Sequence, residues 1–180
     1  MVGTPLSLKI TKRTNQLRSM EKWEGKVSST LTKANANQIW PLFIDFFNFH
    51  KWFPNLSTCY GVHGTNGEVG GTRYCAGFSL PNKDGGADQV SWSKERLVAV
   101  DHENMAMSYE MVDCNVGYKS YLSTIRVVGG DGEGEGCVIE WSFSVNPIDG
   151  LTYEDLFQRY QTRLDQTTKK MEDSLVQNNG

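Results

Sequence analysis

The sequence predicts an α+β fold, in which a curved seven-stranded antiparallel sheet surrounds one long C-terminal helix. Seven segments have the alternation or the β-forming composition of strands, and six of them are joined by short turns rich in glycine or asparagine. The segment from Tyr153 to Val176 instead repeats apolar residues at helical spacing. A sheet that curls around such a helix buries its apolar stripe. Where the helix leaves the concave face unfilled, we expect an internal cavity, which is a natural ligand site.

Composition indicates one globular domain with a substantial core. The chain has 180 residues, of which 38% are hydrophobic and 11% aromatic. Its net charge is -3, but residues 1–20 hold four basic side chains and no acidic one. Taking these four from the total of 18 leaves 14 basic against 21 acidic side chains, a net charge of -7. A body with this charge is a poor partner for nucleic acid. We expect a flexible N-terminal tail at 1–20 and a single domain at 21–177.

The cysteines and histidines do not predict a metal site. None of the four cysteines forms a CxxC motif, and no histidine stands at metal-ligand spacing from one. In the absence of a secretory leader, we expect reduced thiols and a cytoplasmic location. No apolar run approaches the roughly 20 residues that span a bilayer, so we expect no integral membrane contact.

The first elements are a strand and a helix. Residues from Trp23 to Leu31 alternate between apolar or small and polar side chains, as in a strand with one solvated face. From Ala34 to Phe47 the apolar residues take helical spacing, with Asn35 as the predicted N-cap. A second short helix is predicted from Phe49 to Phe53, ended by Pro54.

Six strands and the long helix follow. Thr152 is the predicted N-cap of the helix. The strand with the clearest alternation has Ile139, Trp141, Phe143 and Val145 on its inner face. The predicted strands are Ser57–His63, Gly71–Phe78, Gln89–Val98, Ala106–Asp113, Tyr118–Val128 and Cys137–Asn146.

The hairpin from Gly70 to Val98 carries the most informative pair of charges. Its loop lies near Asp84 and Gly85, which places Arg73 opposite Glu95 on one face. Periodicity alone favours burial of the other face, with Tyr74 and Trp92, and an exposed ion pair worth roughly 0–1 kcal/mol. The alternative is a pair inside a cavity, because the small residues around it leave room for a ligand. The local pattern leaves both open.

Several segments resemble the plant lachrymatory factor synthase group of the START/Bet v 1-like superfamily, which is also described as polyketide cyclase/dehydrase and lipid transport. The resemblance covers roughly 21–176 in the order of the elements above. It is carried by the segments Lys22–Val27, Asp45–Lys51, Gly71–Tyr74, Trp92–Val98, Gly117–Tyr121, Glu140–Phe143 and Gly150–Thr152.

The resemblance implies a helix-grip fold with an internal cavity, and it implies that the face with Arg73 and Glu95 points inward. Arg73 and Glu95 match an arginine and a glutamate that are required in that group, where an alkenyl sulfenic acid is isomerised to a thial S-oxide without a metal or organic cofactor. We expect Tyr121 to assist them as a third catalytic residue. We expect further side chains to line the cavity, namely Phe47, Tyr109, Trp141, Phe157 and Tyr160. Ser91, where a larger aromatic residue is expected, alters the shape of the cavity, so the substrate does not transfer.

The sequence therefore predicts a protein that binds a small hydrophobic molecule in a cavity centred on Arg73 and Glu95. The alternative is a cofactor-free isomerase that uses the same residues. A passive lipid carrier is a third possibility. A receptor of the abscisic acid type is disfavoured, because Cys114–Gly117 stands where those receptors carry a His-Arg-Leu latch.

Overall fold

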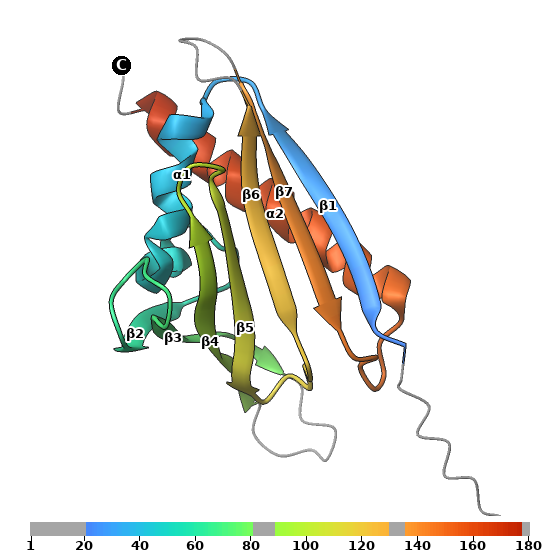
Figure 1. The fold of residues 1–180 in the computed structure, drawn as a ribbon. Helices are drawn as coiled ribbons and strands as arrows, with labels where there is room; N and C mark the ends of the chain where they lie inside the picture. Colours follow the sequence, from blue (N-terminus) through green and yellow to red (C-terminus); the bar gives the residue numbers. More distant parts are fainter. Residues whose placement is uncertain (1–20, 81–88, 130–135, 178–180) are drawn as a thin grey trace, which may run out of the picture.

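A computed structural model describes residues 21–80, 89–129 and 136–177, and it contains one seven-stranded antiparallel sheet (Figure 1). The sheet order is β1-β7-β6-β5-β4-β3-β2. Strands β2 to β7 therefore form a meander, and the first strand of the chain, β1, pairs with the last one, β7. The strands are β1 Trp23–Leu31, β2 Thr58–His63, β3 Thr72–Leu80, β4 Gln89–Asp101, β5 Ala106–Cys114, β6 Leu122–Gly129 and β7 Cys137–Val145. The predicted tail at 1–20 and the tip of the β3–β4 hairpin lie outside the described residues.

The predicted helix at 34–47 is divided in two. Helix α1 covers Ala36–Ile44 and the 3-10 helix η1 covers Phe46–Lys51, in place of the separate helix predicted at 49–53. Asn35 is the N-cap, as predicted, and forms a capping box with Gln38: each side chain accepts a hydrogen bond from the other residue's backbone N–H. The division falls at Asp45, whose ψ of 56° lies outside the helical range.

Helix α2, Tyr153–Gln177, crosses the concave side of the sheet, and α1 lies beside its C-terminal half (Figure 1). Thr152 caps the N-terminus of α2, as predicted. The backbone N–H of Asp155 donates to Thr152 Oγ1 at 3.1 Å, and the Thr152 hydroxyl donates to the Asp155 carboxylate at 2.8 Å. The helix is therefore anchored at the point where it begins to line the interior.

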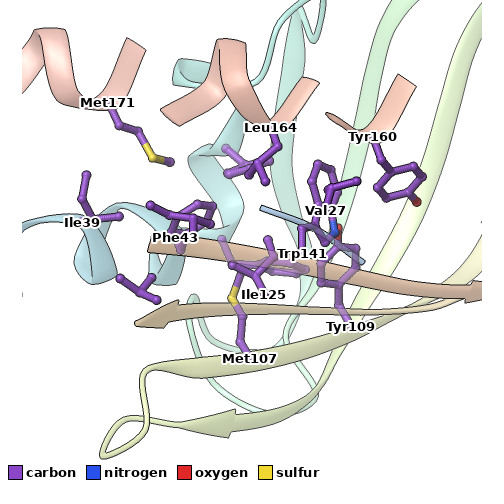
Figure 2. Close-up of a cluster of buried hydrophobic side chains, with 14 of the residues drawn as sticks. Val27, Ile39, Phe43, Met107, Tyr109, Ile125, Trp141, Tyr160, Leu164 and Met171 are labelled. Carbon is purple, nitrogen blue, oxygen red and sulfur yellow. The ribbon is translucent and has the colours of Figure 1, made fainter. Parts of the chain in front are cut away.

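The interior has a close-packed end and an open end. At the packed end, side chains from α1, the sheet and α2 exclude solvent almost completely (Figure 2). They include Ile39, Phe43, Met107, Ile125, Leu164 and Met171. Further towards the N-terminus of α2, Tyr109, Trp141 and Tyr160 replace the aliphatic residues. Larger side chains with polar atoms therefore gather at one end of the gripped helix.

Burial shows which face of the β3–β4 hairpin points inward. Arg73 and Cys75 on β3 are buried, whereas Val90 on β4 is 53% exposed. Tyr74 and Trp92 lie on the convex face, where their rings stack at a centroid distance of 6.0 Å. The interpretation from periodicity alone, which buried the aromatic face, is therefore wrong. Stacking across strands stabilises aromatic side chains on a face that is only partly covered.

Strand β6 begins later than predicted. It starts at Leu122 rather than at Tyr118, because Gly117 and Ser120 both have positive φ, at 82° and 52°, which breaks the extended conformation. The intervening residues form a connection that places Tyr118 flat against Tyr121, with ring centroids 5.5 Å apart. This connection becomes part of the wall of the open end.

Candidate functional site

A cavity of about 530 Å³ occupies the open end of the interior. Its walls come from η1, β3, β4, β5, β7 and α2, together with the β5–β6 and β7–α2 connections. These elements are distant in the sequence, and the sheet's curvature around α2 brings them together. The predicted residues Arg73, Glu95, Tyr109, Tyr121, Trp141 and Tyr160 all line it.

Arg73 is a buried cation held on several sides. Its Nε and Nη2 donate to Oε2 of Glu95 at 2.9 and 2.6 Å, and its Nη1 donates to the backbone oxygen of Phe46 at 2.9 Å. The guanidinium carbon lies 3.8 Å from the centre of the Phe46 ring, a cation–π contact. Burial, the largest single effect, lowers the pKa of Arg73, but the Glu95 carboxylate together with smaller contributions from Cys75, Cys59 and Tyr109 outweighs it, and the net shift is upward. Arg73 therefore stays charged inside the protein.

Glu95 meets Arg73 through the register of the hairpin. The two residues are direct partners in the β3–β4 pairing, as the loop position predicts. The side chain of Glu95 is 12% exposed, and its Oε1 accepts a hydrogen bond from Ser93 Oγ at 3.0 Å. Oε2 thus accepts two hydrogen bonds and Oε1 one, which leaves one of the carboxylate's approximately four acceptor sites, on Oε1, for a further donor.

Three tyrosines place phenol groups in the same space. The hydroxyl of Tyr160 on α2 donates to the hydroxyl of Tyr121 at 2.5 Å, and the rings of Tyr121 and Tyr109 are 6.2 Å apart. Burial raises the pKa of Tyr109 to about 12, with a further contribution from Glu95, and it raises the pKa of Tyr121 and Tyr160 as well. All three phenols therefore remain protonated at neutral pH.

Trp141 forms a rigid part of the wall. Its Nε1 donates to Ser123 Oγ at 2.6 Å, and Ser123 donates in turn to the backbone oxygen of Ser142 at 2.9 Å. The indole also meets the Tyr160 ring edge-on, at a centroid distance of 4.7 Å. With its N–H satisfied by the protein, Trp141 presents an apolar surface.

Two predicted ligand contacts lie elsewhere. The ring of Phe47 packs on Gly61 of β2, where an added Cβ would meet ring atoms at 2.3 Å, and Phe47 does not reach the cavity. Phe157 packs against Tyr153, with ring centroids 6.1 Å apart. Phe157 precedes Tyr160 by three residues and Arg163 follows it by three, so the two lie roughly 60° from Tyr160 on opposite sides of the helix, and only the side with Arg163 meets the cavity. Both predictions are wrong as to lining.

Sequence reasoning missed several lining residues. Phe49 on η1 and Phe53, two residues after its end, take the place expected for Phe47. Tyr118 enters from the β5–β6 connection. Arg159 and Arg163 line the side formed by α2, and their four-residue spacing around Tyr160 was a usable signal, since such residues share one helix face.

The described residues include no group of three or more histidine, cysteine or acidic side chains arranged to hold a metal ion. In the same ranges, every helix is too short or too polar to cross a bilayer.

Comparison with known proteins agrees with this architecture. The family model described as polyketide cyclase / dehydrase and lipid transport matches residues 22–174. The chain belongs to this family. MLP-like protein 423 of Arabidopsis thaliana is 33% identical over 113 residues, which cover 61% of this chain and 68% of that protein.

Solved structures support the Bet v 1-like helix-grip fold. Ginseng major latex-like protein 151 from Panax ginseng superposes with a TM-score of 0.60 at 19% identity, covering 84% of this family member and 97% of that chain. The protein XoxI from Bacillus cereus gives a TM-score of 0.64 at 20% identity, covering 87% and 98%. At this level of identity the likeness concerns the fold.

Proposed function

We propose that this protein binds one small, mostly apolar molecule in the cavity, with Arg73 and Glu95 as its buried polar contact. The observation that carries the proposal is the cavity itself, about 530 Å³ of space at one end of an otherwise close-packed interior. Ligand sites in proteins typically enclose about 300–1,000 Å³ and combine apolar walls with a few polar groups. The family's description as lipid transport supports the same class of ligand.

The polar groups define what such a ligand would meet. An arginine has five N–H donors, and Arg73 uses three of them on Glu95 and Phe46. The remaining donors suit a carbonyl or hydroxyl oxygen. Because the charges of Arg73 and Glu95 offset each other, the pair favours a neutral polar group on the part of the ligand that contacts it.

The proposal is tested by filling the cavity from one side of β4. Ser91 is buried and lines the cavity, whereas its neighbour Val90 is 53% exposed on the convex face. We expect Ser91→Phe to weaken the binding of 1-anilinonaphthalene-8-sulfonate by tenfold or more, about 1.4 kcal/mol, in a fluorescence titration. Val90→Phe is the matched control and should bind as the unmodified protein does.

Circular dichroism of both variants establishes that they are folded, since an added aromatic ring can strain a packed site. Equal binding by the two folded variants would place the probe outside the cavity and contradict the proposal.

A second candidate function is cofactor-free isomerisation of an alkenyl sulfenic acid. It is favoured by one observation: a carboxylate, a guanidinium and three protonated phenols line the same cavity. In this hypothesis Glu95 takes the proton from the sulfenic oxygen and a proton is returned to the alkene carbon farther from sulfur, while the C=C bond becomes single and the C–S bond becomes double, so that the composition of the molecule is unchanged. Arg73 stabilises the negative charge on oxygen during the transfer, and Tyr121 assists as a neutral donor.

The isomerase hypothesis is tested with freshly generated alkenyl sulfenic acid and gas chromatography of the product. Glu95→Gln should reduce turnover by about a hundredfold or more. Glu110→Gln is the control, because Glu110 forms an ion pair with Arg96 at a site where both side chains are considerably more exposed. No turnover by the unmodified protein would exclude this substrate and leave the binding function.

A further inference from the structure

Two cysteine side chains meet beneath the cavity wall. Cys59 on β2 and Cys75 on β3 are direct partners in the antiparallel pairing, and their sulfur atoms are 3.3 Å apart. Both residues are buried, at 6% and 4% exposure. Opposed residues in such a pair have Cα atoms about 4.5 or 5.5 Å apart, which lies within the range of about 4.4–6.8 Å that disulfides span. The backbone therefore already has the geometry that a cross-strand disulfide needs.

We propose that Cys59 and Cys75 form an oxidation site, in which a small peroxide entering the cavity converts the two thiols into a disulfide between β2 and β3. The proposal does not depend on which ligand the cavity binds. It rests on the pairing of the two sulfurs and on their different access to the cavity.

Access differs because Cys75 lines the cavity and Cys59 lies behind it. Both thiols are shielded from bulk solvent, so the cavity is the route by which an oxidant reaches them. Hydrogen peroxide is small enough to take this route. Cys75 is therefore the first sulfur to be oxidised and Cys59 is the resolving partner.

The electrostatic surroundings support thiolate formation. The hydrogen bond from Cys75 lowers the pKa of the Cys59 thiol against the effect of burial, and the nearby Arg73 guanidinium lowers it further. The same hydrogen bond, with burial, raises the pKa of Cys75. The pair therefore carries one shared proton more readily than two separate thiols would, and this proton can pass between the sulfurs.

The chemistry balances with hydrogen peroxide as the oxidant. Cys75 passes its proton to Cys59 and attacks one peroxide oxygen; the O–O bond breaks, and the departing hydroxide takes the proton of the Cys59 thiol, so that water leaves and Cys59 is again a thiolate. Cys75 is then a sulfenic acid. The Cys59 thiolate attacks its sulfur, the S–O bond breaks, and the departing hydroxide takes up from solvent the proton that Cys59 released when it ionised, so that a second water leaves. Two thiols and one peroxide thus yield one disulfide and two waters.

The test is a native oxidation of the full chain. Reduced protein is treated with hydrogen peroxide, quenched with iodoacetamide and analysed by mass spectrometry without reductant. We expect the protein to lose two hydrogen atoms and two alkylation sites. Because trypsin cleaves after Arg73, it separates the two cysteines, and a linked pair of peptides identifies the bond. Reduction with dithiothreitol should restore both thiols.

Single variants test the order of events. In Cys59→Ser, Cys75 has no resolving partner, and we expect a sulfenic acid that dimedone traps at Cys75. In Cys75→Ser, Cys59 should react at least about tenfold more slowly, because it is buried behind the wall. The double variant Cys114→Ser/Cys137→Ser is the control and should form the disulfide at the unmodified rate.

Several results would overturn the proposal. One is a folded, unmodified protein in which peroxide gives sulfinic acid and no Cys59–Cys75 link. Another is a link that involves Cys114 or Cys137. Equal reactivity of Cys59 in Cys75→Ser and of Cys75 in Cys59→Ser would contradict entry through the cavity.

Discussion

Glu95 lies directly opposite Arg73 in the β3–β4 ladder, and one of its carboxylate oxygens accepts hydrogen bonds from both Nε and Nη2 of the guanidinium. The pair faces a cavity rather than solvent, with side-chain exposures of 4% and 12%. A second pair of the same composition, Arg96 and Glu110, joins β4 to β5 with exposures of 51% and 34%. The protein therefore contains an internal control for what burial does to an arginine–glutamate pair.

The first prediction concerns stability. Glu95→Gln leaves the buried Arg73 without a charged partner, and we expect it to lower the free energy of unfolding by about 3 kcal/mol. Glu110→Gln, at the more exposed pair, should cost about 0–1 kcal/mol. Urea denaturation measures both. Equal losses of unfolding free energy in the two variants would contradict this prediction, because they would mean that the buried ion pair contributes no more to stability than the exposed one.

The second prediction follows from the buried phenols. Burial raises the pKa of Tyr109 to about 12 from its ordinary value of 10.0, and the pKa values of Tyr118, Tyr121 and Tyr160 shift the same way. Above pH 10 the unfolded chain therefore releases protons that the folded chain retains. The contribution of these phenols to the free energy of unfolding should be constant below about pH 9 and should fall as pH rises from 10 towards 12, by about 1.4 kcal/mol per pH unit for each phenol.

Urea denaturation across this pH range measures how steeply the free energy of unfolding falls with pH. Tyr109→Phe should make that fall less steep by the contribution of one phenol, about 1.4 kcal/mol per pH unit. An unchanged slope in that variant would show that Tyr109 ionises equally in the folded and unfolded chain.

The third prediction concerns the start of α1. Asn35→Ala removes one half of the capping box with Gln38 and should lower the free energy of unfolding by about 1 kcal/mol. Asn37→Ala is the matched control, because Asn37 is exposed inside the helix, where alanine is the better helix former. Thermal denaturation should show a lower midpoint for the first variant only.

The fourth prediction concerns the charge of the ligand. Arg159, Arg163 and Asp149 also line the cavity, and Arg159 is exposed; apart from the offsetting charges of Arg73 and Glu95, the lining therefore carries two basic side chains and one acidic one. We expect dodecanoic acid to bind more tightly than dodecanol, and Arg159→Gln to reduce that preference by about threefold, less at high salt.

Lys169→Gln, further along α2, serves as the control in isothermal titration calorimetry. If Arg159→Gln weakens the acid and the alcohol equally, the residue acts through packing and not through its charge.

The elements of the fold could be predicted because their signals are local. Alternation in β7 identified its inner face, since every second residue from Cys137 to Val145 is buried. Asn35 and Thr152 marked where helices begin. Failures occurred where a few residues change the direction of the chain: the ψ of Asp45 splits a helix, and positive φ at Gly117 and Ser120 delays β6. Such dihedral changes leave no periodic signal.

The candidate site was only partly predictable. Arg73 and Glu95 are brought together by a hairpin register that the loop position encodes. Phe49 and Phe53 line the cavity where Phe47 was predicted to do so. This difference depends on how η1 packs against β2 and β3. The meeting of Cys59 with Cys75 depends on the pairing of the edge strand β2, whose register shifts between Gly61 and His63.

The sequence by itself determined the order of the elements, the caps, the alternation within strands and the pairing of Arg73 with Glu95. Only the tertiary structure decided which face of the hairpin is concave. Periodicity relates residues a few positions apart, and it is the same for a sheet that curves either way. The direction of curvature is decided by packing against α2, which buries Leu164 and Met171 against the sheet and α1 and leaves the space beside Tyr160 open. That packing turned a surface-like ion pair into the polar centre of a cavity.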